Sequence, residues 1–125
     1  MNALARFDLI YRTNGDIGAL LAGVYLYNLQ GEWIGFVTPE QKVYSVHGQY
    51  AGEMAPERRI VRKREYDYRQ PAQPPPPPPG RIRPPAHLPL APLLPELPFN
   101  QIDVLESEPD RLPTLDFGEY RRDME

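Results

Sequence analysis

The sequence predicts an all-β fold: an antiparallel meander of about seven strands, closed or nearly closed into a small pseudo-symmetric barrel, followed by an extended proline-rich arm. Two adjoining stretches, YNLQGEWIGFVTPEQKV and YSVHGQYAGEMAPERRI, align without a gap over seventeen residues. Within each copy, turn-forming glycines and prolines recur about every eight residues. The runs between them are rich in Val, Ile, Tyr, Trp and Phe, which is the composition of β-strands. A helix would carry glycine or proline in its interior throughout, so helix is rejected.

The repeat keeps a tyrosine, two glycines, a proline and a glutamate at fixed positions. At a spacing of seventeen the shared pairs are Tyr27 and Tyr44, Gly31 and Gly48, Gly35 and Gly52, Pro39 and Pro56, and Glu40 and Glu57. An earlier copy, offset by sixteen residues, keeps Tyr11 and Gly15 and has Ala19 in place of Gly35. Internal periodicity of this length predicts a fold built from repeated supersecondary units.

Each unit contains two predicted turns. The first is a polar residue before glycine, which accepts the positive φ of a hairpin loop: Asn14-Gly15, Gln30-Gly31 and His47-Gly48. The second, Thr38-Pro39-Glu40-Gln41 and Ala55-Pro56-Glu57-Arg58, has proline at the first corner of a type I turn, and the first unit uses Ala22-Gly23 instead. Strands are therefore expected at roughly 7–12, 16–21, 24–29, 32–37, 42–46, 49–54 and 59–64.

Gly35 and Gly52 fall in the middle of predicted strands, once in each unit. A missing side chain at such a position indicates a β-bulge or the close approach of another backbone segment. Repeated bending at these positions is expected to curl the meander into a barrel.

The Tyr-x-x-x-Gly-x-x-x-Gly units, each a hairpin of about seventeen residues, and the proline-rich tail after them resemble the bacterial four-fold β-flower proteins. The resemblance covers residues 7–64 and implies a shallow, square barrel whose hairpins are the petals; it implies no biochemical activity. A fourth unit would need tyrosine near 61 and glycine near 65, but the chain has Val61 and Glu65. The last petal is therefore expected to be incomplete or to be filled by another segment.

The composition changes after the β-repeat module, which is expected to span residues 1–66. Residues 67–87 are expected to be a proline-rich linker, because the run Pro74–Pro79 favours a stiff polyproline II helix. The linker also contains a PxxPxR sequence, formed by Pro76, Pro79 and Arg81. Such a sequence is either a plain spacer or a ligand for an aromatic-lined groove.

Residues 88–106 are expected to dock. Pro89, Pro92, Pro95 and Pro98 recur with the three-residue period of polyproline II, so one edge of that helix is all proline. The second edge carries Leu88, Ala91, Leu94 and Leu97, and the third carries Leu90, Leu93, Glu96 and Phe99. Two apolar edges are not the composition of a solvated linker, so we expect docking on the chain's own barrel or on a neighbouring subunit.

The end of the chain is expected to contribute one short strand and then a tail. NQIDVLE, residues 100–106, is expected to pair with the edge left by the missing petal. Residues 107–125 are acidic and interrupted by proline, and they are expected to form a mobile tail.

Residues that carry chemistry are few. The chain has no cysteine, His47 occupies a turn position and His87 lies among prolines, so no catalytic, metal or cofactor site is expected. A basic stretch raises a nucleic-acid surface as a minor alternative, although the net charge is −3 and cations also protect edge strands. Its residues are Arg58, Arg59, Arg62, Lys63 and Arg64.

These observations predict a non-catalytic structural or protein-interaction module whose partner is an unknown protein or a second copy. The alternative is a barrel that binds an apolar ligand or a membrane surface, with aromatic residues lining its mouth instead of its core. The candidate contact residues are Trp33, Tyr50, Pro76, Pro79 and Arg81. No stretch approaches the ~20 apolar residues of a membrane span or forms a signal peptide, so a cytoplasmic location is expected.

Overall fold

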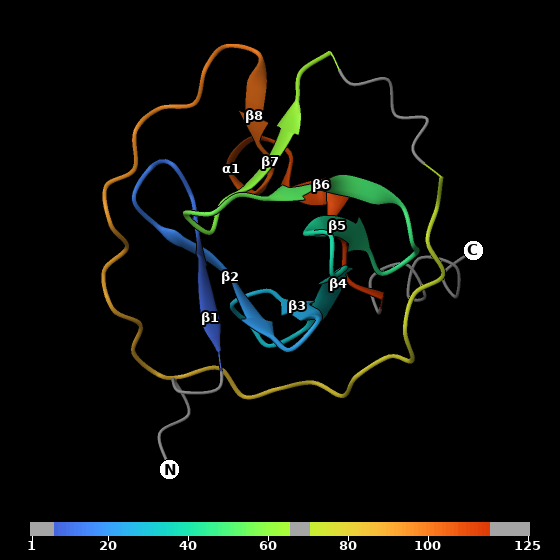
Figure 1. Ribbon diagram of the computed structural model, residues 1–125. Helices are drawn as coiled ribbons and strands as arrows, with labels where there is room; N and C mark the ends of the chain where they lie inside the picture. Colours follow the sequence, from blue (N-terminus) through green and yellow to red (C-terminus); the bar gives the residue numbers. More distant parts are fainter. Residues whose placement is uncertain (1–6, 66–70, 116–125) are drawn as a thin grey trace, which may run out of the picture.

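The computed structural model describes residues 7–65 and 71–115 (Figure 1). Eight strands form one antiparallel meander in which each strand pairs with the next, and the sheet curls strongly into a half-barrel. The strands are β1 (Asp8–Tyr11), β2 (Ile17–Ala22), β3 (Tyr25–Tyr27), β4 (Trp33–Val37), β5 (Lys42–Ser45), β6 (Tyr50–Met54), β7 (Ile60–Lys63) and β8 (Gln101–Asp103). A short helix α1 (Val104–Ser107) and a 3-10 turn η2 (Pro109–Arg111) follow. The all-β prediction and its seven strands are confirmed.

The glycines of the predicted hairpin loops lie at chain reversals. Gly15, Gly31 and Gly48 have φ values of 98°, 86° and 82°, in the left-handed region that favours glycine. The N–H of each glycine donates to the carbonyl three residues earlier, as in Gly48 to Ser45 at 2.9 Å. The proline turns close in the same way, since the Gln41 N–H donates to the Thr38 carbonyl at 2.9 Å.

The mid-strand glycines combine a bulge with a close backbone approach. Leu26 pairs with Gly35 and Tyr27 pairs with Trp33, which leaves Ile34 as an extra residue whose side chain enters the core. A β-carbon on Gly35 would lie 2.3 Å from the Tyr44 carbonyl oxygen. The bulge bends the strand at this point and the glycine lets the next strand pass, so both expectations for this position are confirmed.

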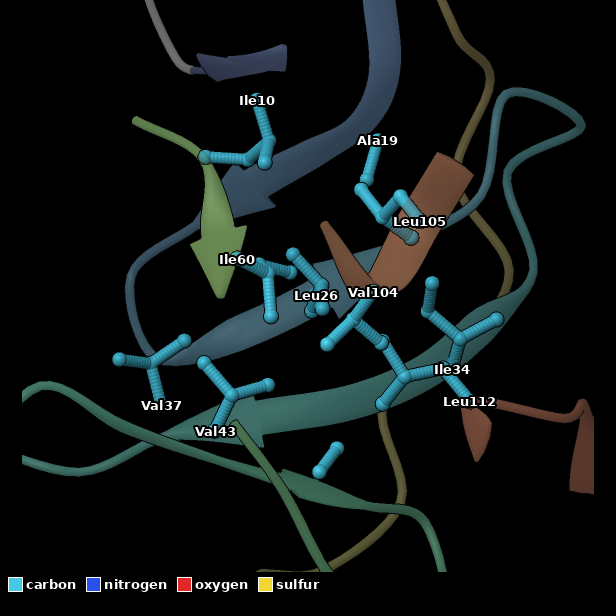
Figure 2. Packing of buried hydrophobic residues seen from close by; sticks show 11 residues of the cluster. Ile10, Ala19, Leu26, Ile34, Val37, Val43, Ile60, Val104, Leu105 and Leu112 are labelled. Carbon is cyan, nitrogen blue, oxygen red and sulfur yellow. The ribbon is translucent and has the colours of Figure 1, made fainter. Parts of the chain in front are cut away.

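The core repeats once per petal. Four residues at equivalent positions of the four hairpins are fully buried and face one another inside the curled sheet: Ile10, Leu26, Val43 and Ile60 (Figure 2). Val104, Leu105 and Leu112 belong to the same cluster and fill the interior between them. The expectation of a mobile tail is wrong for residues 107–115, because Leu112 is buried in the core; residues 116–125 lie outside the described residues.

The fourth petal is completed by β8, which pairs antiparallel with β7. Val61 pairs with Asp103 and Lys63 with Gln101, so the strand predicted within residues 100–106 is confirmed. It is shorter than expected because the Asp103 side chain accepts a hydrogen bond from the Glu106 N–H at 3.2 Å and thereby caps α1. The apolar residues that follow enter the core as a helical turn instead of continuing the strand.

The two ends of the sheet are joined by hydrogen bonds. The Tyr11 N–H donates to the Arg58 carbonyl at 2.8 Å, and Arg58 is the repeat equivalent of Gln41, whose carbonyl accepts from Met54 in the neighbouring petal. The Thr13 N–H and hydroxyl both donate to the Asp103 carboxylate, at 2.8 Å and 2.7 Å.

None of the helices in the described ranges is long and apolar enough to cross a membrane.

Candidate functional site

The proline-rich arm runs around the outside of the curled sheet. Residues 71–100 form no helix or strand and pass the tips of the petals in turn, from the β5–β6 hairpin back to β7 (Figure 1, yellow to orange). In this order the arm meets the loops at Gly48, Gly31 and Gly15 before it pairs with Arg64. The arm therefore lies along the petals of its own chain.

One edge of the arm faces the barrel over its whole length. Half-buried residues recur every third position, with the period of polyproline II: Pro76, Pro79, Ile82, Pro85, Leu88, Ala91, Leu94 and Leu97. Except for Pro84, the residues between them are exposed. Ile82 and Leu88 pack on a second apolar cluster that contains Trp33 and Tyr27. Of the two apolar edges seen in residues 88–99, the Leu88 edge is half-buried against the barrel and the Leu90 edge is exposed.

Backbone hydrogen bonds fix the register of the arm on the petals. The Gln73 N–H donates to the Gly48 carbonyl at 2.9 Å, and nine residues later the Ile82 N–H donates to the Gly31 carbonyl at 3.0 Å. Arg64 donates its N–H to the Asn100 carbonyl at 2.7 Å. Nine residues are three turns of polyproline II, so the arm presents the same edge at each petal.

Side chains of the barrel also donate to arm carbonyls. Proline has no backbone N–H, so a proline-rich segment is held mainly through its carbonyl acceptors. The Tyr25 hydroxyl donates to the Pro77 carbonyl at 2.8 Å. Arg59 reaches the Pro95 carbonyl at 2.7 Å, and the Arg64 guanidinium donates to the Phe99 carbonyl at 2.7 Å while lying 4.5 Å from the centre of the Phe99 ring. The arm is thus held by donors from several petals.

Three of the five predicted contact residues meet. Trp33, Pro79 and Arg81 line one cavity of about 230 Å³ between β4 and the arm, with Glu32 beside them. Pro76 lies one polyproline II turn earlier on the same inward edge. Tyr50 lies apart on β6, with its ring packed edge-on against Tyr44 at 5.8 Å. Trp33 is only 8% exposed and its indole N–H donates to the Gly35 carbonyl; it belongs to the second apolar cluster, on which Ile82 and Leu88 of the arm pack.

The basic stretch is largely turned toward acidic partners in the same molecule. Arg62 is buried and forms a two-pronged ion pair with Glu108, with distances of 2.6 Å and 2.7 Å. Arg59 is also buried and pairs with Glu57 at 2.7 Å, while Arg58 pairs with Asp8 at 3.1 Å. These cations hold the sheet and its C-terminal segment together.

The arm's outer edge is apolar and largely exposed, although the Phe99 ring lies against the Arg64 guanidinium. Leu90 is 97% exposed, Leu93 is 92% exposed and Phe99 is 83% exposed. The prolines of the neighbouring edge, such as Pro92, are exposed as well. Large apolar side chains clustered on a soluble surface mark an interaction site more often than single exposed leucines do.

The described residues offer no sign of a metal site or of a nucleophile with its base. Across residues 7–65 and 71–115, no group of three His, Asp or Glu side chains is placed to hold a metal ion. Ser45 is buried, and its hydroxyl accepts hydrogen bonds from the His47 and Gln49 N–H groups, each at 3.2 Å, within a turn.

No family model, no curated protein and no solved structure matches this chain.

Two features of the arm's contact with the barrel were not predicted. Tyr25 lies in a predicted strand, and nothing in the sequence indicated that its hydroxyl would reach the arm. The nine-residue register falls on residues that are not proline, namely Gln73, Ile82, Ala91 and Asn100, but Ala72, Arg81, Leu90 and Phe99 have the same spacing. Without knowing where the petal tips lie, nothing marked that spacing as meaningful.

Proposed function

We propose that this protein is a non-catalytic protein-interaction module in which the barrel holds residues 89–99 as a rigid polyproline II display. The observation that carries the proposal is the division of this segment into an inward edge that is half-buried and an outward edge that is almost fully exposed. Leu90, Leu93 and Phe99 are almost fully exposed while Leu88 and Leu94 face the barrel. Because the segment is already ordered, less conformational entropy is lost when a partner binds to it.

The size of the display favours a transient partner. Three exposed apolar side chains and the adjoining prolines offer roughly 500 Å², less than the ~800 Å² per partner of a stable complex. The partner is therefore expected to carry an apolar groove that fits the outward edge, and it binds reversibly.

Site-specific crosslinking tests this proposal. A photoreactive residue in place of Leu93 is expected to give an adduct with a partner protein in cells, whereas the same residue in place of the exposed Glu40 gives none. Adding Leu90→Ser to the first variant should remove the adduct without changing the unfolding temperature. An adduct of equal yield at both positions, or one that survives Leu90→Ser, would contradict the proposal.

The barrel interior argues against the alternative of an apolar-ligand cavity. Val104, Leu105 and Leu112 occupy the space that a ligand would take, and all three are buried. Binding to a membrane surface through the outward leucines is distinguished by flotation with anionic and neutral vesicles, in which the protein is expected to stay unbound.

We also propose that the chain is a four-fold β-flower protein. The support is the set of equivalent inward residues, one in each of four petals, and a proline-rich tail that follows them. The departure in the fourth unit is accommodated by β8, which takes the place that residues after Glu65 would fill.

A further inference from the structure

The barrel surface beneath the proline run has the parts of a polyproline-binding site. Tyr25 and Trp33 lie on the paired strands β3 and β4 with ring centroids 6.2 Å apart and ring planes at 77°. The Tyr25 hydroxyl donates to the carbonyl of Pro77, and Trp33 shares a cavity with Pro78 and Pro79. Aromatic rings against proline rings, with a side-chain donor to a ligand carbonyl, are how aromatic-lined grooves hold polyproline II.

Backbone groups define the two ends of the site. The carbonyls of Gly48 and Gly31 accept hydrogen bonds from Gln73 and Ile82, which bracket the six prolines. Nine residues of polyproline II span about 28 Å at ~3.1 Å per residue. A β-carbon on Gly48 or Gly31 would lie 2.1 Å or 2.0 Å from an arm carbonyl, so the arm backbone can approach only because both are glycine. The site therefore selects a proline-rich ligand with N–H groups nine residues apart.

The chain's own arm holds this site by shallow contacts. Within Pro74–Pro79 only Pro76 and Pro79 are half-buried, and the Tyr25–Pro77 hydrogen bond is exposed. No residue of the run is fully buried, whereas Ile82 and Leu88 further along the arm pack on the second apolar cluster. An intramolecular segment binds at an effective concentration in the millimolar range, so weak contacts are enough to keep it in place.

We propose that the Tyr25–Trp33 face is a polyproline II-binding site that accepts a proline-rich segment of another protein in place of residues 73–82. The exchange leaves the core intact, since β8 and α1 stay bound after the run has lifted away. This site lies on the barrel and takes a ligand, whereas the outward edge of residues 89–99 is itself a ligand. The two proposals therefore stand on separate observations.

Titration of a full-length variant tests the site. Replacing Pro74–Pro79 by alternating glycine and serine empties the face while keeping the chain length. A synthetic peptide with the sequence of residues 71–84 is then added, and the emission of Trp33, the sole tryptophan of the chain, is followed. We expect a saturable change in emission with this variant. The unaltered protein is expected to show the same change only at higher peptide concentrations, because the peptide must displace the chain's own segment. Tyr25→Phe in the variant is expected to weaken binding about fivefold, the value of one hydrogen bond.

Controls make every outcome decisive. A peptide with serine in place of Pro76 and Pro79 is expected to bind much more weakly than the original, and circular dichroism checks that each variant keeps its β-sheet signal. If the long replacement unfolds the protein, the double variant Pro76→Ser/Pro79→Ser takes its place. A folded variant whose Trp33 emission ignores the peptide, or whose affinity is unchanged by Tyr25→Phe, overturns the proposal. A doubled mass of the unaltered protein in light scattering would make a second copy the donor of the segment and overturn the assignment to another protein.

Discussion

Gly31 and Gly48 must each be glycine for two separate reasons, one conformational and one steric. Their φ values of 86° and 82° close the hairpin loops, and their missing side chains leave room for the carbonyls of Ile82 and Gln73. The first requirement is local and belongs to the hairpin. The second belongs to the arm, so these two positions link the local repeat to the distant segment that surrounds it.

Alanine substitutions separate these two requirements. Gly23 also has a positive φ, 63°, but nothing lies within 4 Å of the place its β-carbon would take. Gly23→Ala is therefore expected to cost about 1 kcal/mol in unfolding free energy, from backbone strain alone. Gly31→Ala and Gly48→Ala are expected to cost about 2 kcal/mol more, because the arm must also move away. Urea unfolding of the three variants measures the difference; equal losses would mean that the arm is not held where the structure places it.

The sequence could predict only part of what these glycines do. A polar residue before glycine between two apolar runs predicts a loop, and the loops lie where expected. The arm contact involves residues from another part of the chain, and a repeat pattern carries no information about which backbone will pass nearby. The same holds for Tyr25, whose aromatic ring predicts burial but not the partner of its hydroxyl.

The segment from β8 to η2 is a small element with a large share of the core. Val104 and Leu105 enter the curled sheet from α1, and Leu112 follows after η2. Leu112 lies against the glycine gap of β4, 3.1 Å from the position a β-carbon of Gly35 would take. The bulge that bends the strand therefore also makes the space that this leucine fills.

Truncation of Leu112 tests the contribution of this segment. Leu112→Ala is expected to lower the unfolding free energy by about 3 kcal/mol, because the buried site loses apolar contacts and gains a cavity. Leu93→Ala is the matched control: Leu93 is 92% exposed, so the change is expected to stay within about 0.5 kcal/mol. Thermal or urea unfolding of both variants measures the difference in stability. A Leu112→Ala protein as stable as the control would show that the interior does not depend on this segment.

At the level of elements, the strands were predictable and the filling of the barrel was not. Strand positions follow from turn residues that recur at fixed spacing, and β8 follows from an unpaired edge beside an apolar run. Leu105 and Leu112 are separated by acidic and proline residues, and no period connects them. Burial of such isolated leucines depends on a cavity whose shape exists only once the sheet has curled.

Across the whole molecule, ion pairs connect the sheet to its C-terminal segment. Glu108 accepts two hydrogen bonds from Arg62 on β7 and one from Arg111, at 2.8 Å. The hydrogen bond from Arg62 holds the pKa of Glu108 below its ordinary value of 4.5; burial opposes this shift, and the charges of Arg62 and Arg111 reinforce it. A protonated Glu108 would no longer offset the charge of the buried Arg62.

This arrangement predicts a stability that falls in acid. Because the pKa of Glu108 is lower in the folded chain, its contribution is fully present above about pH 4.5 and is lost as the pH falls through the lowered value. Glu108→Gln is expected to destabilise the protein at neutral pH and to flatten the loss of unfolding free energy below pH 4.5. Asp110→Asn, at an exposed neighbouring carboxylate, is the control and should retain the steep acid branch. Identical pH profiles for the two variants would exclude Glu108 as the titrating group.

For the molecule as a whole, the sequence predicted part of the candidate site. The period of three in residues 88–99 predicted docking, and the arm does dock. The pattern could not decide which of the two apolar edges would be buried, because both have similar composition. The PxxPxR sequence at Pro76 to Arg81 was interpreted as either a spacer or a ligand for an aromatic-lined groove, and its Pro79 and Arg81 share a cavity with Trp33 of the same chain.

The pairing of Val61 with Asp103 has a consequence for the nascent chain. A ribosome that has just finished β7 must still add the entire arm before the strand's partner exists. At roughly 5–20 residues per second that interval lasts about 2–8 s. During this time the edge of β7 is bare and the hydrophobic interior is open to solvent, so the emerging polypeptide is most prone to aggregate in this interval. Translation speed through the proline codons thus sets how long that vulnerable intermediate persists.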